Sequence, residues 1–400
     1  MTHMNNADIK VLFGTTAPQV YPQQPFADVT VDFFDAWSKA IRQDKQAKLY
    51  PDIIAFAFWI RKANLEKMKG KNGILHTRIG RGMVFHIAPS NVAINFAYTF
   101  AFGLLTGNAN IVRVSSKHFL QTEIVCRILK EVVVRDSFHW VEERNGIVQY
   151  GRKQEEWSQK FSGICNMRII WGGDRTVQEI RKYPLMPRSN EITFADRYSF
   201  AILSAEAVLD LPAQEKRRLA EGFYNDTYLM DQNACSSPHL VCWLGQETAV
   251  QKAKDLFWEA VYEVSKKYDL ANMKVSEKYT LVCEYAAKSK VSAIKNYENY
   301  LYVAELKDLP KDISDMRGKY GLFFEYAIHG IPEVLKRVTA KVQTCAVFGI
   351  REGEVAEMLL EYPAQGIDRI VPIGRTLDMD IVWDGHDLIR ELSRCISYGK

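Results

Sequence analysis

The chain has 400 residues, more than one ordinary hydrophobic core accommodates, so we expect two or three domains. Hydrophobic residues make up 47% of the chain and charged residues 25%, the proportions of a soluble globular protein. The formal net charge of +4 is small for this length and argues against nucleic acid as the main partner.

Two further classes of protein are excluded by pattern. The most apolar stretch, Val92 to Leu105, contains Asn95 and Gly103 and falls short of the roughly 20 residues that a membrane span needs. The first residues, Met1 to Asn6, lack the apolar core of a secretory signal. The seven cysteines follow neither a CxxC spacing nor a metal-ligand rhythm. We therefore expect reduced thiols in a cytoplasmic protein, with no metal site and no membrane span.

Taken in order, the chain starts with an irregular segment up to about residue 27 and then alternates helical and strand patterns. The basic run from Arg61 to Lys71 has apolar positions at helical spacing, which indicates a solvated helix face. We expect helices over 29–44, 52–67, 118–133 and 176–183, a helix-like apolar stretch from the turn at 89–91 to about residue 107, and strands over 73–78, 82–88, 110–114 and 167–171. Repeated strand, turn and helix units predict a parallel sheet covered by helices.

A second α/β block follows the apolar run Phe200 to Leu203. We expect helices over 211–228 and 247–267, strands over 240–244, 279–283, 301–304, 342–348 and 367–373, and a short helix after 383–389. The predicted domains are a cofactor-binding domain over 1–203, a catalytic domain over 204–370 and a C-terminal segment, 371–400, that docks on the core.

Three turns of the first block follow predicted strands, where sheets of this kind bind ligands. Pro89 stiffens the first turn, and Asn91 offers a carboxamide donor or a helix cap. After the second strand, donors at Arg113, Ser115 and Ser116 suit a ribose or its phosphate, or are simply exposed. In the third turn, Gly172 and Gly173 let a backbone approach a pyrophosphate, although a plain turn has the same composition.

Cys235 lies in a polar segment between a predicted helix and a predicted strand. Asp231, Gln232 and Asn233 precede it, and two serines follow it. Turn amides stabilise a thiolate, which is the nucleophilic form of cysteine. The alternative is a buried, inert thiol, which packs like a small hydrophobic side chain. His86 and His239 flank this chemistry in sequence and are expected to be packed side chains rather than an acid or base.

The order of these pieces resembles the aldehyde dehydrogenase superfamily, whose pattern runs P-W-N, G-N-x-x-x-x-K-P-S-E, G-S and G-Q-x-C. Its counterparts here are Pro89-Ser-Asn91, Gly107 to Ser116, Gly173-Asp174 and Gln232-Asn-Ala-Cys235. Over about residues 73–395 the chain is more closely similar to the LuxC-type acyl-CoA reductases. That resemblance rests on the Cys235 motif, Trp171-Gly-Gly-Asp174, Asp196-Arg-Tyr-Ser-Phe200, Asp368 to Gly374 and Trp383-Asp-Gly385.

The resemblance implies an aldehyde dehydrogenase-like α/β fold with two Rossmann-like domains and a cleft between them. It implies that Cys235 is the nucleophile that takes the acyl group, and that the Asn91 carboxamide and the Cys235 amide form an oxyanion hole. The implied cofactor-binding residues are Pro89, Arg113, Ser115, Ser116, Gly172 and Gly173. Trp383 and Asp384 are expected to dock the tail on the core.

Two departures from the family pattern refine the expectation. Ser116 stands where NAD-selective members carry a glutamate, and Arg113 and Lys117 lie near it, which favours NADPH. The water-activating glutamate is also missing, since Thr193 to Asp196 replace its motif, although Glu191 and Asp196 lie close in sequence. An acyl-enzyme without that base is expected to hydrolyse slowly, as suits a thioester reductase.

The expected function is therefore NADPH-dependent reduction of an acyl-CoA, or another acyl thioester, to an aldehyde through a cysteine acyl-enzyme. An oxidative aldehyde dehydrogenase, an acyl-phosphate reductase and a non-catalytic assembly partner of the same fold remain alternatives. An acyl-transferring synthetase partner and a homo-oligomer are both compatible with this expectation.

Overall fold

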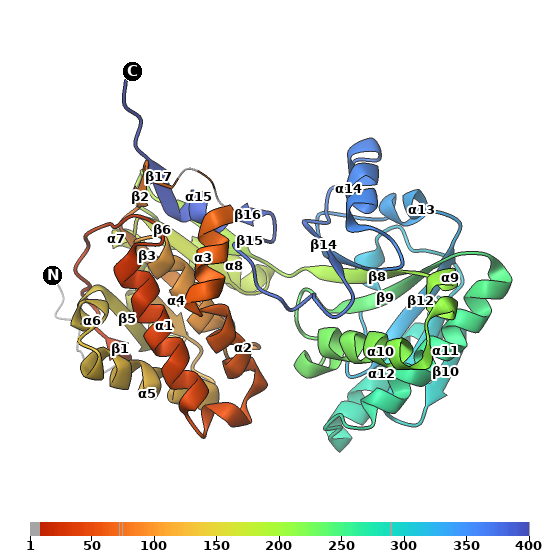
Figure 1. Ribbon diagram of the computed structural model, residues 1–400. Helices are drawn as coiled ribbons and strands as arrows, with labels where there is room; N and C mark the ends of the chain where they lie inside the picture. Colours follow the sequence, from red (N-terminus) through yellow and green to blue (C-terminus); the bar gives the residue numbers. More distant parts are fainter. Residues whose placement is uncertain (1–8, 72, 74, 289, 400) are drawn as a thin grey trace. The chain divides into compact units, whose positions relative to one another are not determined.

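The computed structural model describes residues 9–71, 73, 75–288 and 290–399, which form two compact units (Figure 1). The first unit combines the described residues up to Ala195 with those from Met379 onward, and the second spans Asp196–Asp378. We expected boundaries after residues 203 and 370. The first division comes earlier because strand β8 (Tyr198–Ser204) pairs with strands of the second unit. The second comes later because the chain near Gly374 bonds to a helix of that unit.

A six-stranded sheet organises the first unit. Its strand order is β1 (Lys10–Gly14), β5 (Asn145–Gln149), β4 (Ala109–Val114), β3 (Met83–Ile87), β6 (Met167–Trp171) and β7 (Asn190–Phe194). All neighbouring pairs are parallel except β1 with β5. The chain builds outward from β3 through β4 to β5 and then returns to the other side of β3 with β6 and β7. A topological switch point therefore lies between β3 and β6.

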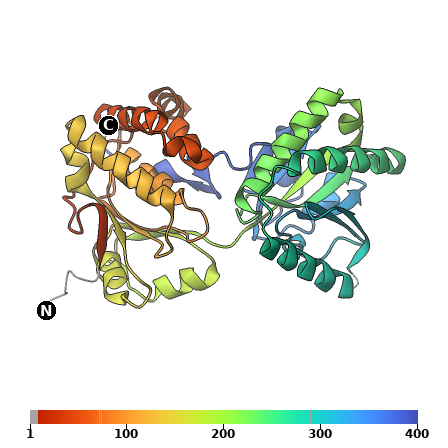
Figure 2. The ribbon, with the colours of Figure 1, turned by 90° about the horizontal axis from the view of Figure 1, so that it is seen from below.

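Helices cover both faces of this sheet (Figure 2). Crossovers between parallel strands are right-handed, so reversing the direction of strand addition moves the connecting helices to the opposite face. One face carries α1 (Asp28–Gln43), α2 (Pro51–Trp59), α3 (Lys62–Lys71), α4 (Asn95–Leu105), α5 (Leu120–Arg135), α6 (His139–Arg144) and α15 (Leu388–Leu392). The other face carries α7 (Glu155–Ile164) and α8 (Asp174–Arg181).

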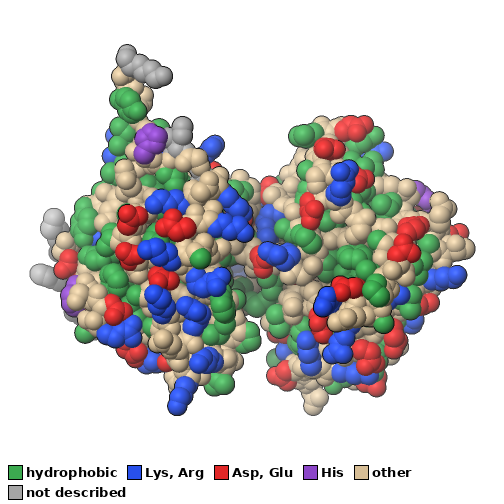
Figure 3. All heavy atoms as spheres, in the orientation of Figure 1, with side chains coloured by type: hydrophobic (Ala, Val, Ile, Leu, Met, Phe, Trp, Pro, Cys, Tyr) green, Lys and Arg blue, Asp and Glu red, His purple; other side chains and the backbone are tan. Residues whose placement is uncertain are grey.

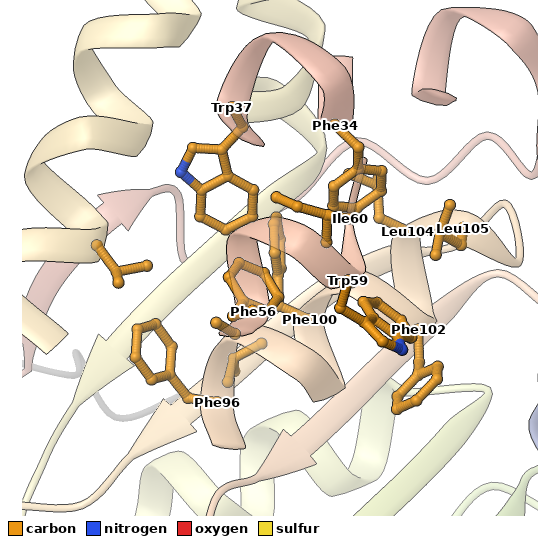
Figure 4. Close-up of a cluster of buried hydrophobic side chains, with 14 of the residues drawn as sticks. Phe34, Trp37, Phe56, Trp59, Ile60, Phe96, Phe100, Phe102, Leu104 and Leu105 are labelled. Atoms are coloured by element: carbon orange, nitrogen blue, oxygen red, sulfur yellow. The ribbon is translucent and has the colours of Figure 1, made fainter. Parts of the chain in front are cut away.

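The aromatic core on the first face explains why α4 is so apolar. Almost all of its residues are buried, and Figure 4 shows Phe96 and Phe100 among side chains from α1 and α2. The Trp37 ring of α1 meets Phe56 and Phe100 edge-on, with ring centroids 5.2 and 6.1 Å apart. Edge-on contacts of this kind stabilise by about 0.5–1.5 kcal/mol beyond area burial. The stretch considered as a membrane span is thus an internal helix of a folded domain.

Helix α3 contains the basic run and behaves as a solvated face. Leu65 and Met68 point into the core, while Lys62 pairs with Asp32 of α1 at 2.8 Å. Figure 3 shows Lys and Arg side chains interspersed with Asp and Glu on this part of the surface. Exposed pairs of this kind contribute about 0–1 kcal/mol each, so the run serves solubility more than stability.

A seven-stranded sheet organises the second unit. Its order is β10 (Val291–Tyr297), β11 (Leu301–Leu306), β12 (Leu322–Ile328), β9 (Pro238–Leu244), β8, β13 (Val342–Phe348) and β14 (Arg369–Pro372). Every pair is parallel except the edge pair β10 and β11. One face packs against α9 (Ala205–Asp210), α10 (Ala213–Thr227) and α11 (Glu247–Ser265). The other packs against α12 (Asn272–Ala287), α13 (Ile331–Leu335) and α14 (Glu352–Glu361).

Most predicted elements are present, and the parallel sheets with covering helices are confirmed. The helix expected over 52–67 is divided into α2 and α3. The strand expected over 73–78 begins only at its last residue, as β2 (Arg78–Gly80), which pairs with β17 (Ser393–Cys395); residues 72 and 74 lie outside the described residues. The segment expected to be irregular contains β1, which closes the sheet edge beside β5.

The strand expected over 279–283 is wrong, because these residues lie in the middle of α12. The run Tyr279 to Cys283 combines aromatic and β-branched residues, which favours a strand in isolation. In the structure the buried positions of this helix are Lys278 and Val282, four residues apart, as one face of a helix requires. Tertiary burial of that face overrides the local preference.

Within the described part of the chain, none of the helices has the length and apolarity needed to cross a membrane. The tail returns to the first unit as β15 (Val382–Trp383), β16 (His386–Asp387), α15 and β17. Trp383 is buried in the core of that unit, so it docks the tail as expected.

Candidate active site

The Cys235 segment has the predicted setting. Helix α10 runs into the short 3-10 helix η3 (Tyr228–Met230), a polar turn follows, and β9 begins at Pro238. Cys235 is half-buried in that turn. Because β9 is parallel to its neighbours, the turn lies at the amino ends of the strands of the second sheet.

Backbone and side-chain hydrogen bonds fix the Cys235 main chain. The Ser199 hydroxyl of β8 donates to the Cys235 carbonyl at 2.7 Å and accepts from the Thr344 amide of β13 at 3.2 Å. The Ser237 amide donates to the Ala234 carbonyl at 2.9 Å. The Cys235 thiol is thus carried on a turn that is bonded internally and to β8, through a serine that β13 also bonds.

Unusual backbone geometry precedes the cysteine. Asp231 and Gln232 both adopt left-handed conformations, with φ of 53° and 57°. Such conformations are uncommon for residues other than glycine and need support from their surroundings. Asp231 accepts from Lys274 at 2.9 Å and from the Tyr268 hydroxyl. The buried Gln232 carboxamide accepts from the Gly321 amide at 2.7 Å and donates to the Leu322 carbonyl at 3.1 Å.

The other six cysteines lie in environments of a different kind. Cys126, Cys165, Cys242 and Cys345 are buried, and burial raises the pKa of each of these thiols, to about 12 for Cys126 and Cys165. Cys283 and Cys395 are exposed, on α12 and on β17. Cys235 is therefore the one thiol that combines partial burial with a polar turn.

A buried carboxyl group lies behind the Cys235 turn. Asp226, near the end of α10, accepts from the Gly374 amide at 2.6 Å and from the Thr376 amide at 3.0 Å. Its own carbonyl accepts from the Ser237 hydroxyl at 2.7 Å. Burial raises the pKa of Asp226 to about 7, because the two amide bonds only partly offset the loss of hydration. Sequence reasoning missed this residue, which ties the Asp368 to Gly374 motif to α10.

The candidate cofactor residues of the first unit lie along one edge of its sheet. Pro89 and Asn91 follow β3, Ser115 and Ser116 follow β4, and the two glycines follow β6. These are the carboxyl ends of neighbouring parallel strands, so the topology brings the residues to the same edge. The loops after β3 and β6 flank the switch point, where open α/β sheets bind their ligands.

The two glycines after β6 have different surroundings. A Cβ on Gly172 would lie 3.0 Å from a methyl group of Thr176, whereas a Cβ on Gly173 would meet nothing within 4 Å. Gly173 caps α8 with its carbonyl, which accepts from the Thr176 amide at 2.8 Å. Its exposed backbone at a helix start suits a phosphate, because the first amides of a helix lack partners within the helix.

The Arg113 side chain is less available to bind a cofactor than the sequence suggests. Its guanidinium lies 4.6 Å from the centre of the buried Tyr150 ring, and it donates weakly to the Tyr150 carbonyl at 3.5 Å. Ser115 is half-buried and accepts from the Lys117 amide at 3.1 Å, while Ser116 and Lys117 are exposed. The exposed donors after β4 are thus Ser116 and Lys117, and the Lys117 ammonium lies 5.0 Å from the centre of the Phe119 ring.

Both acids near the missing glutamate are paired with arginines. Glu191 of β7 is held between Arg168 and Arg181, each with a contact of 2.7 Å. Asp196 accepts from Arg317 at 3.0 Å. A general base needs a lone pair directed at a water molecule. Both oxygens of Glu191 are bonded to guanidinium groups, whereas Asp196 has one such bond, at Oδ1, and is half-buried.

The two histidines are packed, as expected. His86 is fully buried between Thr99 and Asn110, with nitrogen to oxygen distances of 2.7 and 2.9 Å, and burial lowers its pKa to about 4. His239 is buried and stacks on Tyr198 with ring centroids 5.3 Å apart, and burial lowers its pKa to about 3. Both side chains are neutral at pH 7, which removes them as proton carriers there.

Two arginines of the sequence motifs, Arg197 and Arg369, form hydrogen bonds between segments near the amino ends of the strands, where the Cys235 turn also lies. Arg197 bonds to the Val342 carbonyl at 2.9 Å and to Asp368. Arg369 donates to the Thr376 and Asp378 carbonyls, each at 2.9 Å. These contacts explain why Asp196 to Phe200 and Asp368 to Gly374 occur together in the sequence pattern.

Comparisons with known proteins agree with this arrangement. No curated protein matches the chain. Among solved structures it is similar, at 13% identity in each case, to three aldehyde dehydrogenases. The first is an NAD-dependent benzaldehyde dehydrogenase from Corynebacterium glutamicum, with a TM-score of 0.60 over 92% of this chain and 84% of that one. The second is a salicylaldehyde dehydrogenase from Pseudomonas putida G7 complexed with salicylaldehyde, with a TM-score of 0.63 over 92% of this chain and 83% of that one. The third is a lactaldehyde dehydrogenase from Escherichia coli, with a TM-score of 0.61 over 91% of this chain and 85% of that one.

These likenesses confirm the predicted aldehyde dehydrogenase-like fold. A family model described as acyl-CoA reductase (LuxC) matches residues 61–396, which is most of the chain. That range contains every motif on which the sequence resemblance depends. The protein therefore belongs to the acyl-CoA reductase (LuxC) family.

Proposed function

We propose that this protein reduces an acyl thioester to an aldehyde with NADPH, through an acyl group carried on Cys235. The observation that supports this most strongly is the difference in environment between Cys235 and the other cysteines. Cys235 lies half-buried in a polar turn, while four other cysteines are buried with raised pKa values. The thiolate is the reactive form, so a buried apolar thiol is a poor nucleophile.

The proposed reaction has two stages. The Cys235 sulfur attacks the acyl carbon, a carbon–sulfur bond to the enzyme forms, and the thiolate of CoA or another carrier leaves. A nicotinamide cofactor, when bound, supplies the hydride that reduces the thioester carbonyl. The thiohemiacetal anion left on Cys235 then collapses: its carbon–sulfur bond breaks, the aldehyde is released and the thiolate returns. The Ser199 and Gln232 hydrogen bonds keep the attacking sulfur on a fixed backbone during both stages.

Asn91 is proposed to donate its carboxamide to the oxyanion that forms at the acyl carbon. Its support is the family pattern, together with an exposed position at the carboxyl edge of the first sheet. One such donor typically accounts for a factor of about 10²–10³ in rate.

The cofactor is proposed to bind at the carboxyl edge of the first sheet, with its pyrophosphate at Gly172 and Gly173. The open space over Gly173 and the α8 start beside it fit a phosphate group. Pro89, Ser115 and Ser116 lie on the same edge and would border the bound cofactor. The preference for NADPH rests on Ser116 and Lys117, both exposed where an acid would repel a 2′-phosphate. Arg113 is a weaker candidate for that contact, because it already packs on Tyr150.

The paired acids favour reduction over oxidation. An oxidative enzyme must release its acyl group to water, which requires an available carboxylate. Glu191 and Asp196 are both bonded to arginines. The acyl donor is proposed to be acyl-CoA or a protein thioester supplied by a synthetase, and a reducing cytoplasm would keep the thiol of Cys235 intact.

The decisive experiment is intact-mass analysis of the protein after incubation with a panel of acyl-CoAs without cofactor. We expect a mass increase of one acyl group that maps to Cys235 and is lost when NADPH is added, with aldehyde as the product. Cys235→Ala should abolish the adduct, and Cys283→Ala, which removes an exposed thiol on α12, should retain it. An adduct that maps to Cys283 or Cys395 would overturn the assignment, and a protein that takes no acyl group would favour a non-catalytic partner.

A further inference from the structure

The lysine at position 278 is buried in a way that the proposed reaction does not explain. Its side chain is fully covered, and among the described residues no carboxylate forms an ion pair with it. Its ammonium nitrogen donates to the backbone carbonyls of Asn299 and Tyr320, the latter at 2.8 Å, and lies 5.2 Å from the centre of the Tyr302 ring. A buried lysine without a counter-ion is costly, and burial lowers its pKa to about 7.

The two carbonyls belong to different turns at the amino ends of neighbouring strands. Asn299 lies in the turn between β10 and β11, next to Glu298, whose φ is 49°. Tyr320 and Gly321 precede β12 with φ of 55° and 90°. A Cβ on Gly321 would lie 2.3 Å from the Tyr300 carbonyl, so the two turns are in direct contact. Lys278 bonds to one carbonyl of each and thereby joins them.

Gln232 joins the second of these turns to the Cys235 turn. Its carboxamide bonds to both the Gly321 amide and the Leu322 carbonyl, and its side chain is buried. This two-point contact fixes both the position and the orientation of Gln232, which has a left-handed backbone three residues before Cys235. A continuous set of hydrogen bonds therefore leads from Lys278 through the 320–322 backbone to Gln232.

We propose that Lys278 is a positioning residue for Cys235, because it anchors the 320–321 turn that Gln232 uses to hold the cysteine turn in its reactive geometry. This inference rests on the proposed role of Cys235 as the nucleophile. Lys278 touches neither the thiol nor the acyl group, and it acts only through the backbone that it fixes. The competing role is a simple anchor of α12, in which case its loss would weaken the helix and leave the Cys235 turn unchanged.

Hydrogen exchange of the full-length protein separates these two roles without relying on activity. Lys278→Met removes the donor and keeps the length of the side chain. Val282→Ala is the matched control, since Val282 is buried one turn later on the same helix and packs only in the apolar core. We expect Lys278→Met to accelerate amide exchange at 231–237 and 320–322 at least tenfold, and Val282→Ala to accelerate exchange in α12 alone. Equal acceleration at 231–237 in both variants, or none in Lys278→Met, would overturn the proposal.

Acylation kinetics then test the coupling. Lys278→Met and Gln232→Met should each slow acylation of Cys235 by roughly tenfold or more, with little change in the acyl-CoA concentration that gives half the maximal rate. Because both act through Gly321, the double variant should be hardly slower than the slower single one. Losses that multiply would mean that Lys278 acts by another route.

Failure of the proposed function can be distinguished from failure of the Lys278 proposal, and a second variant covers the case in which the first does not fold. If the unmodified protein takes no acyl group, the proposed function fails while the exchange experiment still decides the role of Lys278. If Lys278→Met does not fold, Lys278→Gln retains a donor of shorter reach, and its exchange at 231–237 should lie between those of the unmodified protein and Gln232→Met. Exchange equal to that of the unmodified protein would overturn the proposal.

Discussion

Ser116 follows β4 with an exposed side chain, and Lys117 beside it is exposed as well. An acidic residue here would hold the two hydroxyls of a ribose and repel a 2′-phosphate, whereas serine does neither. Ser116→Glu should therefore shift the cofactor preference from NADPH towards NADH, as measured by kcat/KM for each cofactor. Ser90→Glu, at another exposed serine in the loop after β3, is the control and should not reverse the preference. Equal efficiencies with both cofactors in the unmodified protein would refute the selectivity.

The proposed role of Asn91 as an oxyanion donor can also be tested by substitution. Asn91→Ala should lower kcat for aldehyde formation by about a hundredfold or more, because an oxyanion donor acts only as charge develops. Cofactor affinity, measured by fluorescence titration, should change little. A collapse of cofactor binding with preserved turnover would make Asn91 a structural residue of the β3 loop.

The adjacent glycines of the β6 loop predict opposite behaviour on substitution. Gly173→Ala meets no neighbouring atom and should leave the melting temperature unchanged, yet it should weaken cofactor binding if a pyrophosphate approaches that backbone. Gly172→Ala should lower the melting temperature, because its Cβ would crowd Thr176 at 3.0 Å. Unchanged cofactor affinity in Gly173→Ala would move the phosphate away from this loop.

At the scale of elements, the contact of α10 with the 373–376 segment predicts that the free energy of unfolding depends on pH. Asp226 has a pKa of about 7 in the folded protein against an ordinary value near 3.8. The unfolded chain therefore gives up this proton first, and raising the pH from 4 to 7 disfavours folding through this group. Asp226→Asn should flatten that part of the dependence of unfolding free energy on pH, measured by urea titration. Asp255→Asn, at an exposed ion pair, should leave it as it is.

The same elements show why glycine recurs in the motifs. Gly374 has a φ of 91°, and a Cβ there would lie 3.1 Å from the α-carbon of Gly222 in α10. This close approach lets the Asp226 carboxyl group reach the backbone amides of the segment. A larger residue at either glycine would separate α10 from the 373–376 segment, and the bonds of Asp226 to that segment would be lost.

At the scale of the whole molecule, the two buried histidines predict acid sensitivity in both units. His86 and His239 have pKa values of about 4 and 3 when folded, below the ordinary value of 6.5. The unfolded chain binds these protons first as the pH falls below 6.5, so stability decreases from there towards pH 4. His86→Gln should reduce this loss in calorimetric unfolding, whereas His118→Gln, at an exposed histidine, should not.

The pairing of Glu191 and Asp196 with arginines predicts how the proposed acyl group on Cys235 is discharged. Acyl-Cys235 should persist in water for far longer than a catalytic turnover and should be released by added CoA or NADPH. Aldehyde with NADP should give acid very slowly, and faster turnover only with a thiol acceptor. Rapid acid formation without a thiol would reveal a base, and Glu191→Gln and Asp196→Asn would then identify it.

The sequence by itself indicated many of the elements and proposed the candidate groups. Strand periodicities predicted β3, β4 and β6 of the first sheet and β9, β11, β13 and β14 of the second, since burial of one face imposes its period directly on the residues. The polar setting of Cys235 and its Gln232-Asn-Ala-Cys235 pattern were visible because a turn between a helix and a strand leaves its mark locally. The family followed from the order of such motifs.

Only the tertiary structure decided which of these groups is available and what supports it. Periodicity does not reveal partners distant in sequence, so the pairing of Glu191 and Asp196 with arginines and the packing of Arg113 on Tyr150 appear only in the folded chain. The same reason explains the error over 279–283, where burial of one helical face outweighed a local preference for a strand. Lys278, immediately before that run, joins two turns whose residues lie 21 and 42 positions further along the chain.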